Sequence, residues 1–253
     1  MDLGLTGKVV VVTGAASGIG AAVARAAAAE GARLLLTDRD GAGCQRLAET
    51  LGAGHCVADL TDDAAPGAII AASVARFGRV DGLVNAAGLT TRGSFTTGSP
   101  AVWDTLFTVN AKAGFFLMQA VIADLLARNA AGSIVNILSM NAHCGIPELA
   151  IYAATKGAMT TLTRNAAHAH MADRIRVNGI ALGWVATEAE HHMQAEVMGR
   201  GPDWQAKAAA QLPLGRLVTA DEAARLAVFL LGDASVPMSG AIIDFDQKVA
   251  GAI

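Results

Sequence analysis

Near its amino terminus the chain reads Val9-Val10-Val11-Val12-Thr13-Gly14-Ala15-Ala16-Ser17-Gly18-Ile19-Gly20, an apolar run that leads into a glycine-rich turn. Four valines in a row, without polar alternation, are typical of a parallel strand that is covered on both faces. The alanine-rich stretch that follows, Gly18 to Glu30, predicts a helix. Strand, turn and helix together predict the first unit of an α/β fold.

The same pattern returns along the whole chain. Seven short apolar runs, the first included, cover Lys8–Val12, Arg33–Thr37, His55–Ala58, Gly82–Asn85, Ser133–Leu138, Arg176–Ile180 and Ala241–Phe245. Longer helical stretches lie between them, for example Ala101–Arg128 and Leu149–Met171. This rhythm predicts a Rossmann-like, doubly wound parallel sheet of about seven strands with helices on both faces.

The sequence predicts a single domain over residues 1–253, because no linker, repeat or low-complexity tract interrupts the pattern and 53% of the residues are hydrophobic. The least regular stretch, residues 187–213, holds His191, His192 and Trp204. We expect this stretch to cover the substrate as a lid. A simple surface helix pair is the alternative.

The charge balance favours a small-molecule partner. The chain has 19 basic and 22 acidic residues and no basic stripe, which argues against a nucleic-acid partner. Cys44, Cys56 and Cys144 form no C-x-x-C unit, so we expect reduced, buried thiols and no metal site. The first residues lack a basic and an apolar leader region, and Arg25 interrupts the first alanine run. We therefore expect a cytoplasmic protein without a membrane partner.

The glycine turn predicts an anion site. Backbone N–H groups at the start of a helix face a pyrophosphate there, and the missing side chains allow its close approach. Tight packing alone would also explain the glycines, but their place at the first strand-to-helix junction favours dinucleotide binding.

Asp38, at the end of the second predicted strand, favours NAD over NADP. A carboxylate in this position can accept hydrogen bonds from the ribose hydroxyls of an adenosine and would repel a 2′-phosphate. Capping of the next helix is the competing role, but Asp40 before Gly41 can fill it. The neighbouring Arg39 weakens the inference, since its guanidinium could attract that phosphate.

Tyr152 and Lys156 form a pair that can move a proton. Residues four apart on a helix share a face, so the phenol and the ammonium would point into the same space. At about 5 Å and an effective dielectric of about 20, their attraction of about 3 kcal/mol predicts a lowered pKa for the tyrosine. A half-buried tyrosine beside a snorkelling lysine is the alternative.

These motifs occur in the order Thr13-Gly14-x-x-x-Gly18-Ile19-Gly20, Asn85-Ala86-Ala87-Gly88, Asn110, Ser139 and Tyr152-x-x-x-Lys156. From about Leu5 to Asp244, the chain resembles the classical short-chain dehydrogenase/reductase family. The resemblance implies a catalytic tetrad of Asn110, Ser139, Tyr152 and Lys156. Tyr152 would exchange the alcohol proton, Ser139 would bond the same oxygen, Lys156 would hold the nicotinamide ribose, and Asn110 would position a water.

The resemblance also implies the residues that contact the cofactor. Asp59 and Leu60 would lie at the adenine, residues 85–88 would form a wall beside the cofactor, and Thr187 would hold the carboxamide. The full expected set is Gly14, Ser17, Gly18, Ile19, Gly20, Asp38, Arg39, Asp59, Leu60, Asn85, Ala86, Ala87, Gly88, Tyr152, Lys156, Gly183, Val185 and Thr187.

Two segments depart from the family pattern. Leu182-Gly183 stands where Pro-Gly is usual, and Asp244-Phe245-Asp246-Gln247 replaces Asp-Gly-Gly. The loss of permissive glycines implies a different turn or a bulkier contact there. These departures put in doubt any substrate borrowed from better-known members.

We expect hydride transfer between a nicotinamide cofactor and a secondary alcohol or ketone. Polar residues near the expected pocket suggest a sugar or polyol, and the candidate substrate contacts are Asn141, His143, Trp184 and His191. A hydroxyacid, a steroid or an acyl thioester is a further option. The alternatives are an NAD(P)-dependent carbonyl or 3-oxoacyl reductase and a non-catalytic dinucleotide-binding scaffold or sensor.

The resemblance further implies a homodimer or, more often, a homotetramer. Small residues after Tyr152, including Ala153, Ala154 and Gly157, would allow close packing against another subunit, but packing within one chain explains them equally well. The apolar tail, residues 249–253, could reach a neighbouring subunit.

Overall fold

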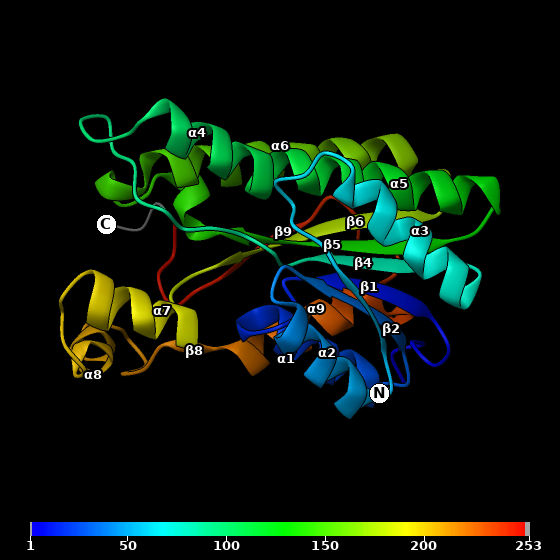
Figure 1. Ribbon diagram of the computed structural model, residues 1–253, viewed down its shortest axis with the longest axis horizontal. Helices are drawn as coiled ribbons and strands as arrows, with labels where there is room; N and C mark the ends of the chain where they lie inside the picture. The colour runs from blue at the N-terminus through cyan, green and yellow to red at the C-terminus, as the bar shows by residue number, and fades with distance from the viewer. Residues whose placement is uncertain (1, 251–253) are drawn as a thin grey trace.

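In the computed structural model, which describes residues 2–250, seven parallel strands form one sheet in the order β3-β2-β1-β4-β5-β6-β9 (Figure 1). Their bounds are β1 Val9–Thr13, β2 Arg33–Asp38, β3 Gly54–Val57, β4 Gly82–Asn85, β5 Gly132–Ser139, β6 Ile175–Leu182 and β9 Ile242–Phe245. Each strand contains or overlaps one predicted apolar run, so the predicted Rossmann-like sheet is confirmed. The end of the apolar tail, residues 251–253, lies outside the described part.

Helices cover both faces of the sheet, with α3, α5 and α6 on one face and α1, α2 and α9 on the other (Figure 1). Their bounds are α1 Gly18–Ala29, α2 Gly41–Leu51, α3 Ala65–Phe77, α4 Pro100–Phe107, α5 Ala113–Ala127, α6 Ala150–His170, α7 Glu188–His192, α8 Trp204–Ala209 and α9 Ala220–Leu231. Short 3₁₀ turns are η2 Met140–His143, η3 Pro147–Leu149 and η5 Asp233–Ser235, and π-turns are η1 Thr108–Lys112 and η4 Met193–Val197.

The strand side chains divide into two apolar cores, one on each face of the sheet. In β1, Val10 and Val12 pack towards α1 and α9, and Val11 packs towards α3 and α5. All three valines are at most 1% exposed. Burial on both faces explains why this strand lacks polar alternation.

The strand order reverses between β1 and β4, because β2 and β3 lie on one side of β1 and all later strands lie on the other. In such sheets the connections after the two central strands leave on opposite faces, which opens a crevice at their carboxyl ends. The fold therefore locates a ligand site at the end of β1.

Two features differ from the sequence-based predictions. The helix expected over residues 101–128 is interrupted by η1, and a short second pair of strands, β7 Val185–Ala186 with β8 Val218–Thr219, was not predicted.

Among the cysteines, Cys44 is buried as expected, but the expectation is wrong for Cys144, which is exposed on the turn after η2. Pro100–Ala127 is long and apolar enough to cross a membrane, but more than half of its most apolar window is buried, as in a core helix.

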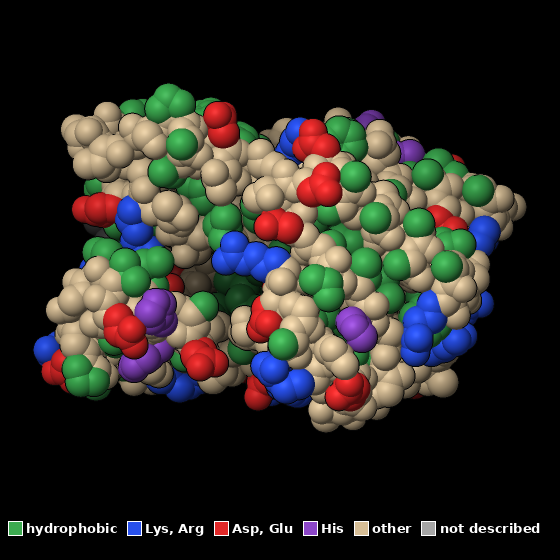
Figure 2. Space-filling model, viewed as in Figure 1, with side chains coloured by type: hydrophobic (Ala, Val, Ile, Leu, Met, Phe, Trp, Pro, Cys, Tyr) green, Lys and Arg blue, Asp and Glu red, His purple; other side chains and the backbone are tan. Residues whose placement is uncertain are grey.

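The segment expected to be a lid folds into α7, η4 and α8, to one side of the sheet (Figure 1). It has a small core of its own, in which Trp204 is 2% exposed and packs on Trp184. The space-filling view is hollowed between the region where Figure 1 places α7 and α8 and the part of the molecule above it (Figure 2).

Candidate active site

The glycine turn and the loop after β4 meet at the reversal point of the sheet. A Cβ atom on Gly14 would lie 2.8 Å from the backbone N of Ala87, and one on Gly20 would lie 2.1 Å from the carbonyl oxygen of Gly14. Both positions therefore require glycine. Thr13 Oγ1 ties the two loops together, since it accepts from the backbone N–H groups of Ala86 and Ala87 at 3.1 Å each.

The start of α1 can hold a pyrophosphate. Ser17 occupies the N-cap position, yet its side chain makes no capping hydrogen bond, which leaves the hydroxyl free to donate to a phosphate. Gly18 has φ of +53°, and a Cβ atom on it would lie 3.5 Å from Cγ2 of Thr187. Two expected cofactor contacts from distant parts of the sequence are thus neighbours.

Asp38 lies at the end of β2, and its carboxylate is held in place by two backbone groups. Oδ2 accepts from the N–H of Ala16 and Oδ1 from the N–H of Asp40, each at 3.0 Å. Asp40 caps α2 as predicted, through a 3.0 Å bond from the N–H of Gly43. Asp40 therefore caps α2, and the Asp38 carboxylate is held beside the glycine turn.

Asp59 and Arg39 lie near each other beyond the ends of β3 and β2. Hydrogen bonds from the backbone and hydroxyl of Thr61 lower the pKa of the Asp59 carboxyl, and the charge of Arg39 adds to this. Both residues lie at the exposed adenine end expected for the cofactor.

Tyr152 and Lys156 are both buried and lie on one face of α6, as predicted. The Nζ atom of Lys156 lies 5.7 Å from the centre of the Tyr152 ring and donates to the carbonyl oxygen of Ile137 at 2.8 Å. Burial lowers the pKa of Lys156 to about 8. The ammonium is thus held at the floor of the site with its remaining donors available to a ligand.

The predicted lowering of the Tyr152 pKa is wrong for the protein without bound ligand. Burial raises the pKa of Tyr152, the Ser139 side chain opposes this rise, and the charge of Glu190 adds to it. Desolvation, which disfavours the phenolate, therefore dominates in the folded chain, and the helical spacing of the pair contains no measure of it.

Asn110 lies in the π-turn η1, and its side chain ties this turn to the loop after β4. Oδ1 accepts from the N–H of Leu89 at 2.8 Å, and Nδ2 donates to the carbonyl of Leu89 at 2.9 Å and to Thr155 Oγ1 at 3.2 Å. A Cβ atom on Gly88 would lie 3.4 Å from Asn110 Oδ1 and 3.6 Å from Lys156 Nζ. The structure therefore brings these three predicted residues to one point. π-turns inside helices frequently mark functional sites.

Ser139 completes the group of four predicted catalytic residues. It is the last residue of β5, opposite Leu182 of β6, and its Oγ accepts from the N–H of Asn141 at 3.2 Å. A cavity of about 10 Å³ lies under the site, lined by Thr13, Asn85, Asn110 and Lys156 among others. The Oδ1 atom of Asn85 has no hydrogen-bond partner among residues 2–250.

Each of the four candidate substrate residues makes a hydrogen bond within the protein. Asn141 Oδ1 accepts from the N–H of Ile146 at 3.2 Å, and His143 Nε2 lies 2.9 Å from Asp244 Oδ1. The Nε1 groups of two tryptophans bond to the segment after β7: Trp184 to Glu190 at 2.7 Å and Trp204 to His191 at 3.0 Å.

The departures from the family pattern make new contacts. A Cβ atom on Gly183 would lie 2.0 Å from Oδ1 of Asp246, so the aspartate fills the space that this glycine leaves open. Gln247 bonds the loop after α8 on two sides: its Oε1 accepts from the N–H of Leu214 at 2.8 Å, and its Nε2 donates to the carbonyl of Arg216 at 2.6 Å.

Sequence reasoning missed Glu190 and Gln194. Gln194 is 3% exposed and donates from Nε2 to Glu190 Oε1 at 2.6 Å. The only signal for Glu190 is its place three residues after Thr187, a spacing that predicts helix capping instead. No cluster of three His, Cys, Asp or Glu side chains within residues 2–250 is arranged to hold a metal ion.

Comparisons with known proteins agree with this geometry. Residues 14–247 match the family model described as enoyl-(acyl carrier protein) reductase. The chain is 35% identical to 2-(S)-hydroxypropyl-CoM dehydrogenase 3 of Xanthobacter autotrophicus, over 96% of both chains. It is 37% identical to galactitol 2-dehydrogenase (L-tagatose-forming) of Cereibacter sphaeroides, covering 96% of this chain and 94% of the relative. It is 35% identical to gluconate 5-dehydrogenase of Gluconobacter oxydans, covering 97% and 95%.

Solved structures match over nearly the whole chain. A variant of the actinorhodin polyketide ketoreductase with NADPH superposes with a TM-score of 0.91 at 26% identity, covering 97% of this chain and 98% of that one. A short chain dehydrogenase/reductase family protein superposes with a TM-score of 0.84 at 33% identity, covering 98% of both chains. The chain therefore belongs to the short-chain dehydrogenase/reductase family, as an NAD(P)-dependent oxidoreductase that acts on CH–OH groups.

Proposed function

We propose that this protein oxidises a secondary alcohol of a sugar or polyol to the ketone with NAD, and that Tyr152 acts as the acid/base. The observation that carries the proposal is the convergence of the buried Tyr152 and Lys156 with Ser139 and Asn110 beside the glycine turn. These residues come from α6, β5 and η1, and the fold brings them to one edge of the sheet.

The glycine turn and the free Ser17 hydroxyl fit the pyrophosphate of a nicotinamide dinucleotide, because side chains at Gly14 and Gly20 would fill its cradle. Asp38 would hold the adenosine ribose, and Lys156 the nicotinamide ribose. Thr187, next to Gly18, would hold the carboxamide. When bound, the cofactor supplies the hydride acceptor.

Tyr152 would accept the proton of the substrate hydroxyl, and Ser139 would donate a hydrogen bond to the same oxygen. The raised pKa of the free tyrosine makes the charge of Lys156 essential, since a phenol must lose its proton before it can act as a base. Lys156 keeps this charge below a pH of about 8, where burial places its pKa.

We infer a preference for NAD from Asp38, whose carboxylate is fixed at the end of β2 by the N–H groups of Ala16 and Asp40. A 2′-phosphate at that carboxylate would meet like charge. The exposed Arg39 beside it would favour NADP instead, and we weigh it less because no hydrogen bond from residues 2–250 holds its guanidinium towards the site.

A sugar or polyol substrate is supported by the relatives named galactitol 2-dehydrogenase and gluconate 5-dehydrogenase. The alternative is a carbonyl or 3-oxoacyl reductase that works towards the alcohol. It is favoured by the family model's description and by the NADPH-bound ketoreductase with a TM-score of 0.91.

We further propose one domain with residues 187–213 as its substrate lid, a cytoplasmic location, and assembly as a homodimer or homotetramer.

A groove of about 310 Å³ between α5 and α6 supports the assembly. It includes the side chains of Phe115 and Leu126, which are 40% and 45% exposed in the single chain. Apolar surface of this kind is typical of subunit contacts. Sedimentation at micromolar concentration tests the proposal, and a monomer would contradict it.

The function is tested by a steady-state screen of secondary alcohols, polyols, sugars and hydroxyacids with NAD and with NADP. We expect the highest kcat/KM for a polyol or sugar with NAD. A higher kcat/KM with NADP on the same substrate would overturn the cofactor preference. Cofactor binding without turnover of any substrate would support the scaffold hypothesis.

A further inference from the structure

Two helices of the chain begin with the same pattern, a threonine followed three residues later by a glutamate. These pairs are Thr187 with Glu190 at the start of α7 and Thr219 with Glu222 at the start of α9. In α9 the pair forms a complete capping box, in which Glu222 Oε2 accepts from the N–H of Thr219 at 2.9 Å. Arg216 also binds Glu222, at 2.7 and 2.8 Å, so both carboxylate oxygens are used.

In α7 only half of the box forms. Thr187 Oγ1 accepts from the N–H of Glu190 at 3.2 Å, but the Glu190 carboxylate does not return to the N-cap. Its Oε1 instead accepts from Trp184 Nε1 at 2.7 Å and from Gln194 Nε2 at 2.6 Å. Its Oε2 accepts no hydrogen bond from residues 2–250. The carboxylate is therefore oriented by one oxygen while the other is free to bind a ligand.

Glu190 lies near the catalytic residues. Trp184, which holds it, comes two residues after Leu182, and Leu182 pairs with Ser139 across β5 and β6. The charge of Glu190 is close enough to raise the pKa of Tyr152. The Glu190 carboxylate, fixed by Trp184 at the end of β6, is thus a negative charge near Tyr152.

A second unused acceptor lies beside it. The Oε1 atom of Gln194 is buried and has no partner within the described residues, and its Nε2 atom is committed to Glu190. A buried acceptor without a donor is costly, so this oxygen requires a donor from a water, an ion or a ligand. Two acceptors side by side require donors, which a polyol supplies as hydroxyl groups.

We propose that Glu190 is a specificity-determining residue, whose carboxylate accepts a hydrogen bond from a neutral substrate hydroxyl near the reacting carbon, and that Gln194 contributes a second acceptor to the same subsite. The inference rests on the proposed dehydrogenase function. It assigns neutral polyols as the substrate class and disfavours carboxylates, sulfonates and phosphates, because these would bring like charge to Glu190.

The structural alternative is that Glu190 only fastens Trp184 to α7. Glu190→Gln separates the two roles, because glutamine has the same shape and can still accept from Trp184. Glu188→Gln is the matched control, since Glu188 is exposed on the same helix. Melting temperature and NAD binding of each variant establish that the fold and the cofactor site are intact.

The readout is kcat/KM with NAD for galactitol, gluconate and 2-butanol, which are a neutral polyol, a sugar acid and an alcohol without further hydroxyls. For Glu190→Gln we expect galactitol kcat/KM to fall about 10-fold, gluconate to rise, and 2-butanol to change less than about twofold. Gln194→Met should lower galactitol turnover by a smaller factor. Glu188→Gln should match the wild type on all three substrates.

The inference would be overturned if the ratio of kcat/KM for galactitol to kcat/KM for gluconate were the same in the wild type and in Glu190→Gln. It would also be overturned if the wild type had a higher kcat/KM for gluconate or 2-butanol than for galactitol. Either result would leave the proposed dehydrogenase function standing, because an alcohol would still be turned over. A wild type that oxidises no alcohol would overturn both.

Discussion

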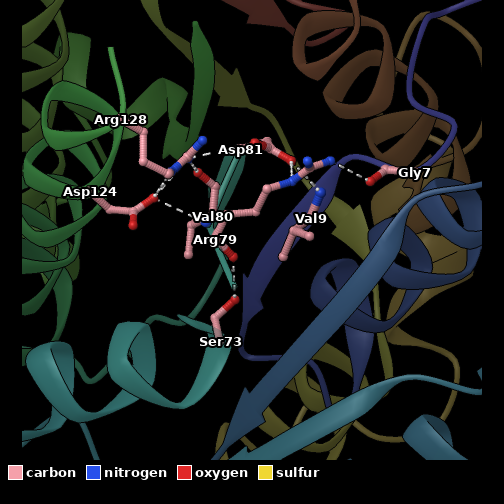
Figure 3. A network of polar contacts seen from close by, with 8 residues as sticks. All are labelled: Gly7, Val9, Ser73, Arg79, Val80, Asp81, Asp124 and Arg128. Atoms are coloured by element: carbon pink, nitrogen blue, oxygen red, sulfur yellow. Dashed lines mark hydrogen bonds and ion pairs between the residues drawn. The ribbon is translucent and has the colours of Figure 1, made fainter. Parts of the chain in front are cut away.

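Polar side chains are paired to different extents at the two edges of the parallel sheet: the amino edge, where the strands begin, and the carboxyl edge, where they end. At the amino edge, Asp81 accepts from the N–H of Val9 at 2.9 Å and from Arg79 at 2.8 Å (Figure 3). Beside it, Asp124 accepts from Arg128 at 2.8 Å and from the N–H of Val80 at 3.1 Å. Both carboxylates at this edge are paired with cations and with backbone donors.

At the carboxyl edge the polar groups lie closer to the core and are paired less completely. Lys156 is 6% exposed and donates to one carbonyl oxygen, and within residues 2–250 no partner is found for Asn85 Oδ1 or, in the neighbouring η4, for Gln194 Oε1. Buried polar groups that lack partners cost stability, and groups with partners avoid this cost. The difference indicates that the amino edge stabilises the fold and that the carboxyl edge gives up stability for ligand binding.

Among the changes at the carboxyl edge, Tyr152→Phe should lower kcat/KM the most. It removes the proton carrier but keeps the ring packed on Leu106 and Ile151, so kcat/KM should fall about 10²- to 10⁴-fold while stability is retained. Steady-state kinetics and thermal unfolding measure the two effects. Turnover near the wild-type rate would sink the proposed role of the tyrosine.

Lys156→Met should stabilise the fold, although most substitutions in a protein core destabilise it. The pKa of Lys156 is about 8 in the folded protein and 10.5 as its ordinary value, so the folded state holds the ammonium less readily than the unfolded state. The loss of stability that comes from burying the ammonium is complete below pH 8 and disappears as the pH rises to 10.5. We expect the variant to be inactive and about 1–3 kcal/mol more stable than the wild type at pH 7.

Urea unfolding at pH 7 and at pH 9.5 measures this difference, which should be smaller at the higher pH. Lys207→Met is the control, because the side chain of Lys207 is 67% exposed and paired with Asp203. A stability gain that does not depend on pH would show that burial of the charge is not the cause.

The sheet and the placement of Tyr152 beside Lys156 could be predicted because their signals are local, whereas Asn110 and Ser139 were named only from the resemblance to the family. Apolar runs such as Val9–Val12 record burial on both faces, and the four-residue spacing of Tyr152 and Lys156 is a property of any helix. The glycines were informative because a side chain at Gly20 cannot fit.

What could not be predicted depends on surroundings that are distant in sequence. The pKa of Tyr152 rises because the fold buries it, and spacing along a helix contains no measure of burial. Glu190 and Glu222 follow a threonine at the same spacing, yet Trp184 and Gln194 turn only Glu190 away from the cap. The pattern predicts a cap in both cases, and tertiary contacts decide.

Asp81→Asn should damage the amino edge without touching the chemistry. The variant weakens the bonds to Arg79 and to the N–H of Val9, and bonds to charged groups are worth about 1–3 kcal/mol. We expect a loss of this size in the free energy of urea unfolding, with kcat per folded molecule unchanged. If kcat fell as far as in Tyr152→Phe, the division of roles between the two edges would be wrong.

Gln247→Ala should have the smallest effect and tests whether the loop after the proposed lid, residues 187–213, is held from the carboxyl edge. Gln247 bonds Leu214 and Arg216, on the loop that connects α8 to β8, and it stands in the segment that departs from the family pattern. Each neutral bond is worth about 0.5–1.5 kcal/mol, so KM should rise about 2- to 13-fold for each of the two bonds on which substrate binding depends. Because the residues of the tetrad are untouched, kcat should change much less than KM.

The matched control is Gln45→Ala, which should leave KM unchanged. Gln45 is an exposed glutamine outside this loop, and it bonds only Glu49 on its own helix. Equal KM values for the two variants would mean that the Gln247 bonds do not hold this loop in place for substrate binding.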